Sequence, residues 1–487
     1  MNKFYITTPI YYVNDKPHIG HAYTTVLADV LARWHKLQRE EVFFLVGADE
    51  HGAKIETAAL SAGKSPQEFV DEKAEDFKNA WQKLNISYDN FIRTTDASHQ
   101  KAVASALETI HKKGLIYQDV YKGLYCKGCE QYKTEDDLID GLCPEHQIEP
   151  ELMEEMSYFF QLAKFRDEIK EKIEANEFEI RPEERKNEVL SFIEGGLKDI
   201  SISRKNVKWG IPLPFDSKYT TYVWIDAFFN YLTGLGWQGK LEGVPNFFPP
   251  DIQLMSKDIL RVHATIWPAL LSALDIPWPK KFFVHGFFTA SGQKMSKSLG
   301  NVIWPEQMVE KFGVDGARYL IMSSLSYGHD GDISWERLTE KYKADLANGL
   351  GNLISRTMTL AQKISFLCHP EHSEGSHKKD SSPLAQNDNK GSEKLRKLYE
   401  EIKPKEILEE IWKEVDWANK YIEEKKLWEL VKNDEQEAKK VLDELFATIS
   451  DVAENLRPFM PETAEKILKI LEAGEMKEGE ILFPRIN

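Results

Sequence analysis

The sequence contains no run of about 18 apolar residues, so no segment is long enough to cross a membrane as a helix. Its first residues lack the succession of a basic, an apolar and a small-residue stretch that marks a secretory signal peptide. These two absences argue against an integral helical membrane protein and against an exported one. We therefore expect the protein in the cytoplasm.

Positive charge is also scarce, because 63 lysines and arginines stand against 79 acidic residues, a net charge of −16. This excludes non-specific nucleic-acid binding driven by overall charge, but it leaves room for a local basic surface. Hydrophobic residues make up 42% and charged residues 29% of the 487 positions, as is typical of globular proteins. A chain of this length is expected to form about two to four domains.

Cysteine is rare, yet three of the four cysteines lie close together. Cys126 and Cys129 form a CxxC motif, and Cys143 and His146 form a CxxH motif separated from it by thirteen residues. In a cytosolic protein such a group favours a metal over disulfides. Four ligands of this kind predict a tetrahedral zinc site, and a site filled by protein ligands alone predicts a structural role.

The fourth cysteine lies in residues 368–393, a polar stretch rich in serine, glycine and proline. We expect a mobile loop there. Cys368 is followed by His369, His372 and His377, which raises the alternative of a second metal site. The irregular spacing and the composition favour a linker.

Hydrophobic patterns predict a parallel sheet built in two halves. Residues 3–8 and the apolar run in 41–52 predict strands, and Ala22, Val26, Val30 and Trp34 mark one face of a helix between them. Strand, helix and strand in this order form a βαβ unit. Residues 251–256 and 280–290 predict two more strands, again with a helix between them. An insertion, residues 116–215, separates the halves and holds the cysteine cluster.

Beyond about residue 345 the pattern is helical throughout, which predicts a bundle. The apolar positions that repeat with helical spacing are Ile411, Val415, Ala418, Ile422, Leu442, Leu445, Ile449, Val452 and Leu456.

The segment "PHIGH" follows the first strand and opens the first helix, which we expect to begin near His21 or Ala22. A helix N-terminus favours phosphate, and ligands bind beyond the carboxyl ends of parallel strands. Gly20 allows close approach of a nucleotide, and His18 and His21 can donate to phosphate oxygens. Two surface histidines at a helix cap explain this segment alone equally well.

The segment "KMSKS", residues 294–298, places two lysines and two serines in a loop bordered by Gly292 and Gly300. Such a loop can close over a triphosphate and stabilise the charge of departing pyrophosphate. A solvated surface loop is the simpler explanation for this segment alone. Combined with "HIGH" after the first strand of a split sheet, the phosphate interpretation prevails.

"HIGH" and "KMSKS" in this order resemble the two signatures of class I aminoacyl-tRNA synthetases, and the match extends over nearly the whole chain. Four segments resemble the methionyl-tRNA synthetase family in particular: "TTPIYYVNDKPHIGHAYTT", "VGADEHG", "YVWIDAFFNYL" and "SKDILRVHATIWPALL". The implied fold is α/β, a Rossmann-like parallel sheet split by a zinc-knuckle insertion and followed by a C-terminal α-helical anticodon-binding bundle. The expected domains are a first catalytic half (1–115), the insertion (116–215), a second catalytic half (216–290), the KMSKS loop with a stem-contact connector (291–345) and the anticodon bundle (346–487).

The resemblance implies an activity and the residues for it. The enzyme would activate methionine with ATP to methionyl-adenylate and pyrophosphate, then transfer the methionyl group to the terminal adenosine of tRNA(Met). His18, His21, Lys294 and Lys297 would stabilise the transition state at the α-phosphate. Gly20, Asp258 and Lys297 would bind ATP, which Mg²⁺ accompanies. The implied methionine site consists of Pro9, Ile10, Tyr12, Asp49, Trp224, Ala227, Tyr231, Ile259 and His263, with Asp49 holding the α-amino group.

An aromatic pocket suits methionine because a thioether makes favourable contacts with aromatic rings. Tyr12 or His263 could offer a polar hydrogen to the sulfur. Trp224 and Tyr231 could equally be ordinary core residues, and on their own they favour that interpretation. Phe228 replaces a proline found in some family members, which concerns the fine shape of the pocket.

In the C-terminal half the resemblance implies that Asn352, Arg356 and Trp428 bind the anticodon. A tryptophan can stack on an unpaired base, and Asn352 and Arg356 can bind base edges or phosphate. The alternative for Trp428 is a bundle core position. Some family members have proline just before this tryptophan, where this chain has Leu427.

The insertion is too short to hold the editing domain that the isoleucine, valine and leucine enzymes carry. The cysteine enzyme binds zinc in its amino-acid pocket, whereas the four metal ligands here are clustered within one local segment. Discrimination therefore rests on the pocket, where a one-methylene difference is worth only about 1–3 kcal/mol, so homocysteine is the expected competitor. The chain ends at "LFPRIN" without the dimerising module of longer relatives, so we expect a monomer. Two rival functions are a nucleotidyltransferase of the same superfamily and a non-catalytic tRNA-binding protein.

Overall fold

The computed structural model describes the chain except for residues 1, 130, 134–137, 291, 296–300, 327, 365–387, 475, 477–480 and 487. The expected loop at 368–393 therefore lies largely outside the described residues. The chain divides into two compact units. The first unit comprises Met1–Lys16, Arg39–Asn79 and Ser87–His285, and the second comprises Pro17–Gln38, Ala80–Ile86 and Gly286–Asn487. No helix in the described part of the chain is long and apolar enough to cross a membrane.

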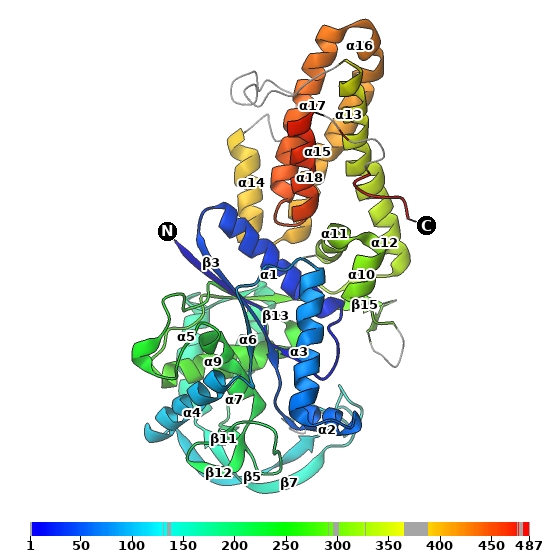
Figure 1. Cartoon of the computed structure of the whole chain (residues 1–487). Coiled ribbons are helices and arrows are strands. Elements are labelled where there is room, and N and C mark those ends of the chain that lie inside the picture. The colour runs from blue at the N-terminus through cyan, green and yellow to red at the C-terminus, as the bar shows by residue number, and fades with distance from the viewer. Residues whose placement is uncertain are drawn as a thin grey trace. The chain divides into compact units, whose positions relative to one another are not determined.

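The first unit is built on a parallel sheet in the order β2-β3-β1-β13-β14-β8, with β4 beside β3 (Figure 1). Its strands are β1 (Lys3–Thr7), β2 (Tyr11–Tyr12), β3 (Glu41–Asp49), β4 (Asn90–Arg93), β8 (Glu179–Arg181), β13 (Ile252–Ser256) and β14 (Lys281–His285). Ile6 of β1 pairs with Ile252 of β13, so the two halves of the sheet meet at its centre. The split parallel sheet predicted from the sequence is confirmed.

The prediction of one strand over residues 280–290 was wrong, because two strands in different sheets occupy this stretch. β14 ends at His285, and β15 (Phe288–Ala290) joins β16 (Gln293–Lys294) and β17 (Gly331–Asp332) in the second unit. At Gly286 an added Cβ would lie 2.1 Å from the carbonyl oxygen of His329. This close backbone approach separates the two strands, and hydrophobicity alone does not reveal it.

Helices cover the sheet and enclose one core. In the first unit they are α2 (Ala53–Ser61), α4 (Ala97–Lys112), α5 (Arg166–Glu174), α6 (Glu183–Glu194), α7 (Val223–Phe228), α8 (Asn230–Thr233) and α9 (Leu260–Ala273), and α3 (Pro66–Lys83) continues into the second unit. Almost every residue of α9 is buried, so this helix lies within the core. Short 3-10 turns precede α5 (Leu162–Phe165) and α9 (Lys257–Ile259).

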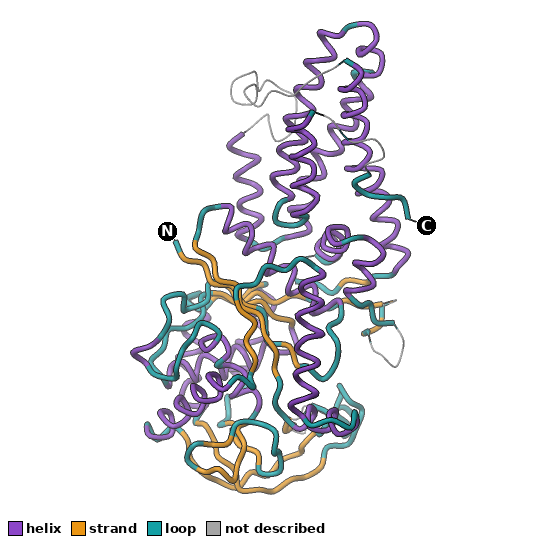
Figure 2. The backbone as a smooth tube through the Cα atoms, viewed as in Figure 1, coloured by secondary structure: helices purple, strands orange, loops and turns teal. Residues whose placement is uncertain are grey.

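The insertion and the residues that follow it to Thr221 form two antiparallel sheets, drawn in orange at the bottom of the view in Figure 2, whereas β8 of the insertion joins the parallel sheet. One sheet is β6-β5-β7-β9, from β5 (Ile116–Cys126), β6 (Gln131–Lys133), β7 (Glu151–Phe160) and β9 (Ile200–Ser201). The other is β10-β12-β11, from β10 (Ser203–Arg204), β11 (Pro212–Leu213) and β12 (Asp216–Thr221).

The second unit is helical apart from its three short strands, as far as the structure describes it. Its helices are α1 (Ile19–Leu37), α10 (Pro305–Phe312), α11 (Val314–Ser324), α12 (Trp335–Lys341), the π-helix η6 (Tyr342–Gly351), α13 (Asn352–Lys363), α14 (Asp388–Glu400), α15 (Pro404–Glu424), α16 (Leu427–Asn433), α17 (Glu435–Leu456) and α18 (Pro461–Ala473). All nine apolar positions of the predicted bundle are buried on α15 and α17. The predicted helical C-terminal part is therefore confirmed.

Candidate functional site

The histidines of "HIGH" cap helix α1 reciprocally. The backbone N–H of Gly20 donates to Nδ1 of His18 over 3.0 Å, and the N–H of His18 donates to Nδ1 of His21 over 3.2 Å. The rings stack with centroids 3.8 Å apart. Because the caps satisfy N–H groups one turn before the expected start, the helix begins at Ile19 rather than near His21 or Ala22.

These caps fix the tautomers of both rings. Since Nδ1 accepts in each case, the proton of a neutral ring lies on Nε2, which is then a donor of the kind that phosphate oxygens require. Burial, and next the neighbouring His18, hold the pKa of His21 well below its ordinary value. An added Cβ on Gly20 would lie 2.9 Å from the His18 ring, so this glycine also makes room for the cap.

The segment that carries "KMSKS" lies beside helix α1 within the second unit. The N–H of Ile19 donates to the carbonyl oxygen of Ile303 over 3.0 Å, and the Tyr23 ring packs edge-on against Phe288 of β15 at 5.6 Å. Lys294 ends β16, opposite Thr289. Lys297 lies outside the described residues. The structure thus brings the chain on both sides of this loop to the phosphate-favouring end of α1.

The implied methionine residues that carry polar groups gather at the carboxyl ends of the first unit's strands. Tyr12 of β2 pairs in register with Asp49, the last residue of β3, and both are half-buried. The Tyr231 hydroxyl lies 3.0 Å from Nε2 of His263, and the Trp224 ring meets the His263 ring edge-on at 5.8 Å. Asp49 is near enough to Tyr231 to raise the pKa of its hydroxyl, although burial is the main cause.

His263 is held as a neutral ring. Its Nδ1 lies 2.9 Å from the carbonyl oxygen of Ile259, which only accepts, so Nδ1 carries the proton and Nε2 accepts from Tyr231. Burial lowers the pKa of His263 to about 4. Both ring nitrogens are therefore engaged, and the ring serves to orient the Tyr231 hydroxyl.

The remaining implied residues of the methionine site are apolar and differ in burial. Pro9 and Ala227 are buried, whereas Ile10 and Ile259 are half-buried. Phe228, the departure from the family pattern, packs edge-on against His263 at 4.9 Å and stacks on Trp267. The larger residue thus lies in the core, against His263.

Asp258, which the family resemblance implies as a ribose ligand, lies at the carboxyl end of a central strand. It follows β13 directly, in the turn Lys257–Ile259, and it is exposed. The Ser256 hydroxyl donates to its carboxylate. A carboxylate at the end of a central parallel strand is suited to bind ribose hydroxyls.

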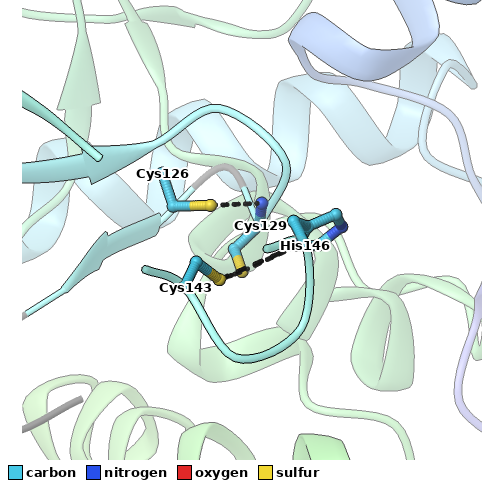
Figure 3. A group of neighbouring side chains, drawn as sticks. All are labelled: Cys126, Cys129, Cys143 and His146. Atoms are coloured by element: carbon cyan, nitrogen blue, oxygen red, sulfur yellow. Dashed lines mark hydrogen bonds between the residues drawn. The ribbon is translucent and has the colours of Figure 1, made fainter. Parts of the chain in front are cut away.

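The four predicted metal ligands converge in the insertion (Figure 3). Their ligand atoms all lie within 4.8 Å of one another, and Sγ of Cys129 is 3.3 Å both from Sγ of Cys143 and from Nδ1 of His146. A zinc ion at about 2.3 Å from sulfur keeps tetrahedral ligands roughly 3.5–4 Å apart, and the separations here, from 3.3 Å to at most 4.8 Å, lie on both sides of that range. At Gly128 a Cβ would lie 2.4 Å from the His146 ring, so only glycine allows this approach.

The protonation chemistry of the cluster also fits a cation. Burial alone would raise the pKa of the Cys143 thiol, but hydrogen bonds with His146 and Cys129 outweigh it and lower that pKa to about 6. The N–H of Cys129 donates to Sγ of Cys126 over 3.4 Å, so this sulfur serves as an acceptor within the cluster. Metal-binding cysteines are thiolates, so the donor set is suited to zinc.

The implied anticodon residues lie on helices α13 and α16 of the second unit. Asn352, the first residue of α13, is exposed, and Arg356 one turn later pairs with Glu423 of α15 over 2.6 Å. Trp428 is half-buried, so it is neither a full core residue nor a free surface one. Leu427 is fully buried and anchors the start of α16.

Sequence reasoning missed a buried polar group in the first unit. His51, His99, Asp226 and Thr233 are joined by hydrogen bonds although they are far apart in the chain. Two of them stood in quoted motifs, since His51 follows Asp49 in "VGADEHG" and Asp226 precedes Ala227 in "YVWIDAFFNYL". Their place in these motifs was the one signal in the sequence that could have pointed to this buried group.

Comparison with known proteins agrees with this geometry. A family model described as "tRNA synthetases class I (M)" matches residues 4–149 and 146–358. Together with the split parallel sheet and the histidine-capped helix after its first strand, this match defines a class I aminoacyl-tRNA synthetase, a ligase. The chain belongs to the methionine family of that class, as its relatives show.

The methionine–tRNA ligase of Rickettsia bellii is 42% identical over 507 residues, covering 100% of this chain and 99% of that protein. That of Caldanaerobacter subterraneus is 42% identical over 511 residues, covering 99% of this chain and 79% of the relative. Among solved structures, Mycobacterium tuberculosis methionyl-tRNA synthetase in complex with methionyl-adenylate is 36% identical. It covers 99% of this chain and 97% of that one, with a TM-score of 0.90.

Proposed function

We propose that the protein is a methionine–tRNA ligase that works through the residues assembled above. A carboxylate oxygen of methionine attacks the α-phosphorus of ATP, which forms methionyl-adenylate and releases pyrophosphate. A hydroxyl of the terminal adenosine of tRNA(Met) then attacks the activated carbonyl, and AMP leaves. The main support for this proposal is the pair of histidines that cap the start of α1. Their Nδ1 atoms accept from backbone N–H groups, and they lie beside the chain that flanks the KMSKS loop.

Activation needs positioning and charge stabilisation rather than a covalent nucleophile. His18 and His21 donate from Nε2 to phosphate oxygens, at a helix N-terminus that itself favours anions. Lys294 and Lys297 neutralise the charge that develops on pyrophosphate. Gly20 and Asp258 are further residues that we assign to ATP binding, and Mg²⁺ would accompany ATP and neutralise charge on its phosphates.

Methionine is bound by the group at the strand ends. Asp49 takes the α-amino group, because a carboxylate pairs with an ammonium. The side chain lies among Pro9, Ile10, Tyr12, Trp224, Ala227, Tyr231, Ile259 and His263. Neutral His263 adds no charge to this pocket and fixes the hydroxyl of Tyr231, which suits an uncharged, polarisable thioether.

Zinc would be held by Cys126, Cys129, Cys143 and His146 and would stabilise the insertion, which is too small to build much core. Because these four protein ligands suffice for a tetrahedral ion, the role of the zinc would be structural. The anticodon of tRNA(Met) is bound by Asn352, Arg356 and Trp428.

The decisive experiment is ATP–pyrophosphate exchange with each of the twenty amino acids, without tRNA. We expect exchange with methionine alone, and homocysteine as the analogue that is activated next best. Lys297→Ala should lower kcat for exchange about 100-fold or more while the KM for methionine changes little. Exchange with another amino acid would overturn the pocket, and exchange with none would favour a tRNA-binding protein without catalysis.

A further inference from the structure

The motif "DEHG", residues 49–52, contains a buried histidine that the activation chemistry leaves unused. Asp49 ends β3 and faces methionine in the proposed function, whereas His51 lies two residues further and is 3% exposed. Its Nδ1 is 2.6 Å from Oδ2 of Asp226, a carboxylate that is entirely buried in α7.

The second oxygen of this carboxylate is also engaged. Oδ1 of Asp226 lies 2.8 Å from Nε2 of His99 on α4, and Nδ1 of the same ring lies 2.7 Å from Oγ1 of Thr233 on α8. His51, Asp226, His99 and Thr233 thus form one continuous chain of hydrogen bonds, which we call the Asp226 network. Every member is less than a tenth exposed.

A buried carboxylate is costly unless each oxygen has a partner. Burial alone would raise the pKa of Asp226, but the charges and hydrogen bonds of His51 and His99 outweigh it and hold that pKa below its ordinary value. Apolar residues of similar volume would pack here with comparable stability, so such a network serves geometry better than stability.

The network joins three of the segments that carry the proposed methionine site. Asp49 precedes His51 by two residues, Trp224 and Ala227 lie on either side of Asp226 on α7, and Tyr231 precedes Thr233 by two residues on α8. The end of β3, helix α7 and helix α8 are therefore connected through directional bonds at the back of this site.

Contacts from Trp209 fix the same loop from its other side. Its indole Nε1 donates to the carbonyl oxygen of Glu50 over 2.5 Å, the N–H of Gly52 donates to the carbonyl oxygen of Trp209 over 3.0 Å, and its ring meets His51 edge-on. Arg93 pairs with Glu50 over 2.7 Å. The backbone after Asp49 is thus held on two sides.

We propose that His51, Asp226, His99 and Thr233 are positioning residues for methionine binding. They set the spacing between Asp49, which takes the ammonium, and the aromatic wall of Trp224 and Tyr231. The inference rests on the proposed function, because the ligand placed by this spacing is the amino acid. A misplacement of about 1 Å in such a site costs roughly 100-fold, so the network governs methionine affinity more than ATP affinity.

The test measures ATP–pyrophosphate exchange by the full chain with methionine and ATP varied separately. Thr233→Val removes the hydroxyl at the end of the network while keeping its shape, and Thr233→Ser restores the hydroxyl. Asp226→Asn removes the central charge. Ser157→Ala is the matched control, because it deletes a buried hydroxyl bonded to Ser201 and Ser203, remote in contacts from this network.

We expect the KM for methionine to rise about 5-fold in Thr233→Val and about 30-fold or more in Asp226→Asn, with the KM for ATP within about 2-fold. Thr233→Ser and Ser157→Ala should retain the wild-type KM for methionine. Should Asp226→Asn fail to fold, the valine and serine variants decide the question.

The inference is overturned if Thr233→Val keeps the wild-type KM for methionine, or if both KM values rise together. Absence of methionine-dependent exchange in the wild type would instead refute the proposed function. The two failures are therefore distinguishable.

Discussion

Single residues in this enzyme gain their roles from partners that fix one proton or one rotamer. His263 is the clearest case, since the carbonyl oxygen of Ile259 holds its proton on Nδ1 and burial lowers its pKa to about 4. A ring that resists protonation keeps positive charge away from the pocket that we propose for the uncharged methionine side chain. The same burial means that protonation of the ring in acid destabilises the fold.

His263 should weaken the fold as the pH falls. Its folded-state pKa of about 4 lies below the ordinary value of 6.5. The unfolded chain therefore takes up this proton first, and stability present above pH 6.5 is lost on acidification toward pH 4. The loss amounts to about 3 kcal/mol. Urea unfolding between pH 4 and 7.5 should show a shallower acid dependence for His263→Gln than for the wild type.

Tyr231→Phe is the matched control for this prediction, because it removes the hydroxyl partner of Nε2 but leaves the imidazole buried. It should keep the acid dependence of the wild type. Equal slopes for His263→Gln and the wild type would show that other groups cause the acid loss.

The stability of an individual element depends on how many apolar side chains it buries. The turns around Cys129 and Cys143 bury few apolar side chains, because Ile139 and Leu152 beside them are largely exposed. Helix α16 is short and is fixed at its start by Leu427. Such elements need a metal or a neighbouring helix to hold their shape.

Removing one of the proposed zinc ligands should unfold the turns of the insertion and leave the parallel sheet intact. We expect about one zinc per wild-type chain and a small fraction of that in Cys143→Ser. Trypsin should then cut rapidly after Lys127 and Lys133. Elemental analysis and mass spectrometry of the digest measure both effects. Cys368→Ser, outside the described residues, is the control and should keep its zinc.

Trp428→Ala should impair tRNA recognition without affecting activation. Loss of one stacked base costs about 1–3 kcal/mol, so kcat/KM for tRNA(Met) should fall roughly 10- to 100-fold while methionine-dependent exchange stays unchanged. Trp417→Ala offers a matched control, since Trp417 is also half-buried in the bundle and stacks on Tyr421 at 4.8 Å. A parallel loss in both variants would point to bundle damage instead.

At the scale of the whole molecule, the features that can be predicted from the sequence are those marked by a local pattern of residues. Apolar runs and helical spacing predict the split parallel sheet and the bundle, and the cysteine spacing predicts a cluster that the structure assembles. The Asp226 network could not be predicted, because His51 and Asp226 are 175 residues apart and their pairing depends on the completed fold. The grouping of α1 with the second unit was equally hidden, since it depends on contacts made by Arg318 of α11.

Substitution of the buried residue Arg318 should strongly lower the stability of the second unit. Its guanidinium is fully buried, donates to Asp29 of α1 over 2.7 Å and to the carbonyl oxygens of Leu84, Pro458 and Phe459. Arg318→Met leaves Asp29 with a less complete set of partners in the core, which should cost about 3–5 kcal/mol of unfolding free energy. Urea unfolding measures this cost.

A second substitution distinguishes charge from packing at this position. Asp29→Leu combined with Arg318→Met should recover much of the loss, because the charge that then lacks the Asp29 carboxylate, Arg33, is partly exposed and keeps its bonds to Asn85. The exposed pair of Lys83 and Glu306 is the control, and Glu306→Gln should change stability by less than about 0.5 kcal/mol. No recovery in the double variant would mean that the arginine acts through its carbonyl contacts.

The central pairing of β1 with β13 has a consequence for synthesis on the ribosome. Tyr5 donates its backbone N–H to Asp251, a partner 246 residues further along the chain. At roughly 5–20 residues per second, β1 emerges about 12–50 s before the strand that completes its sheet. During that interval the edge of β1 that will pair with β13 has no native partner, so the nascent N-terminal half exposes an unpaired strand edge of the kind that chaperones protect.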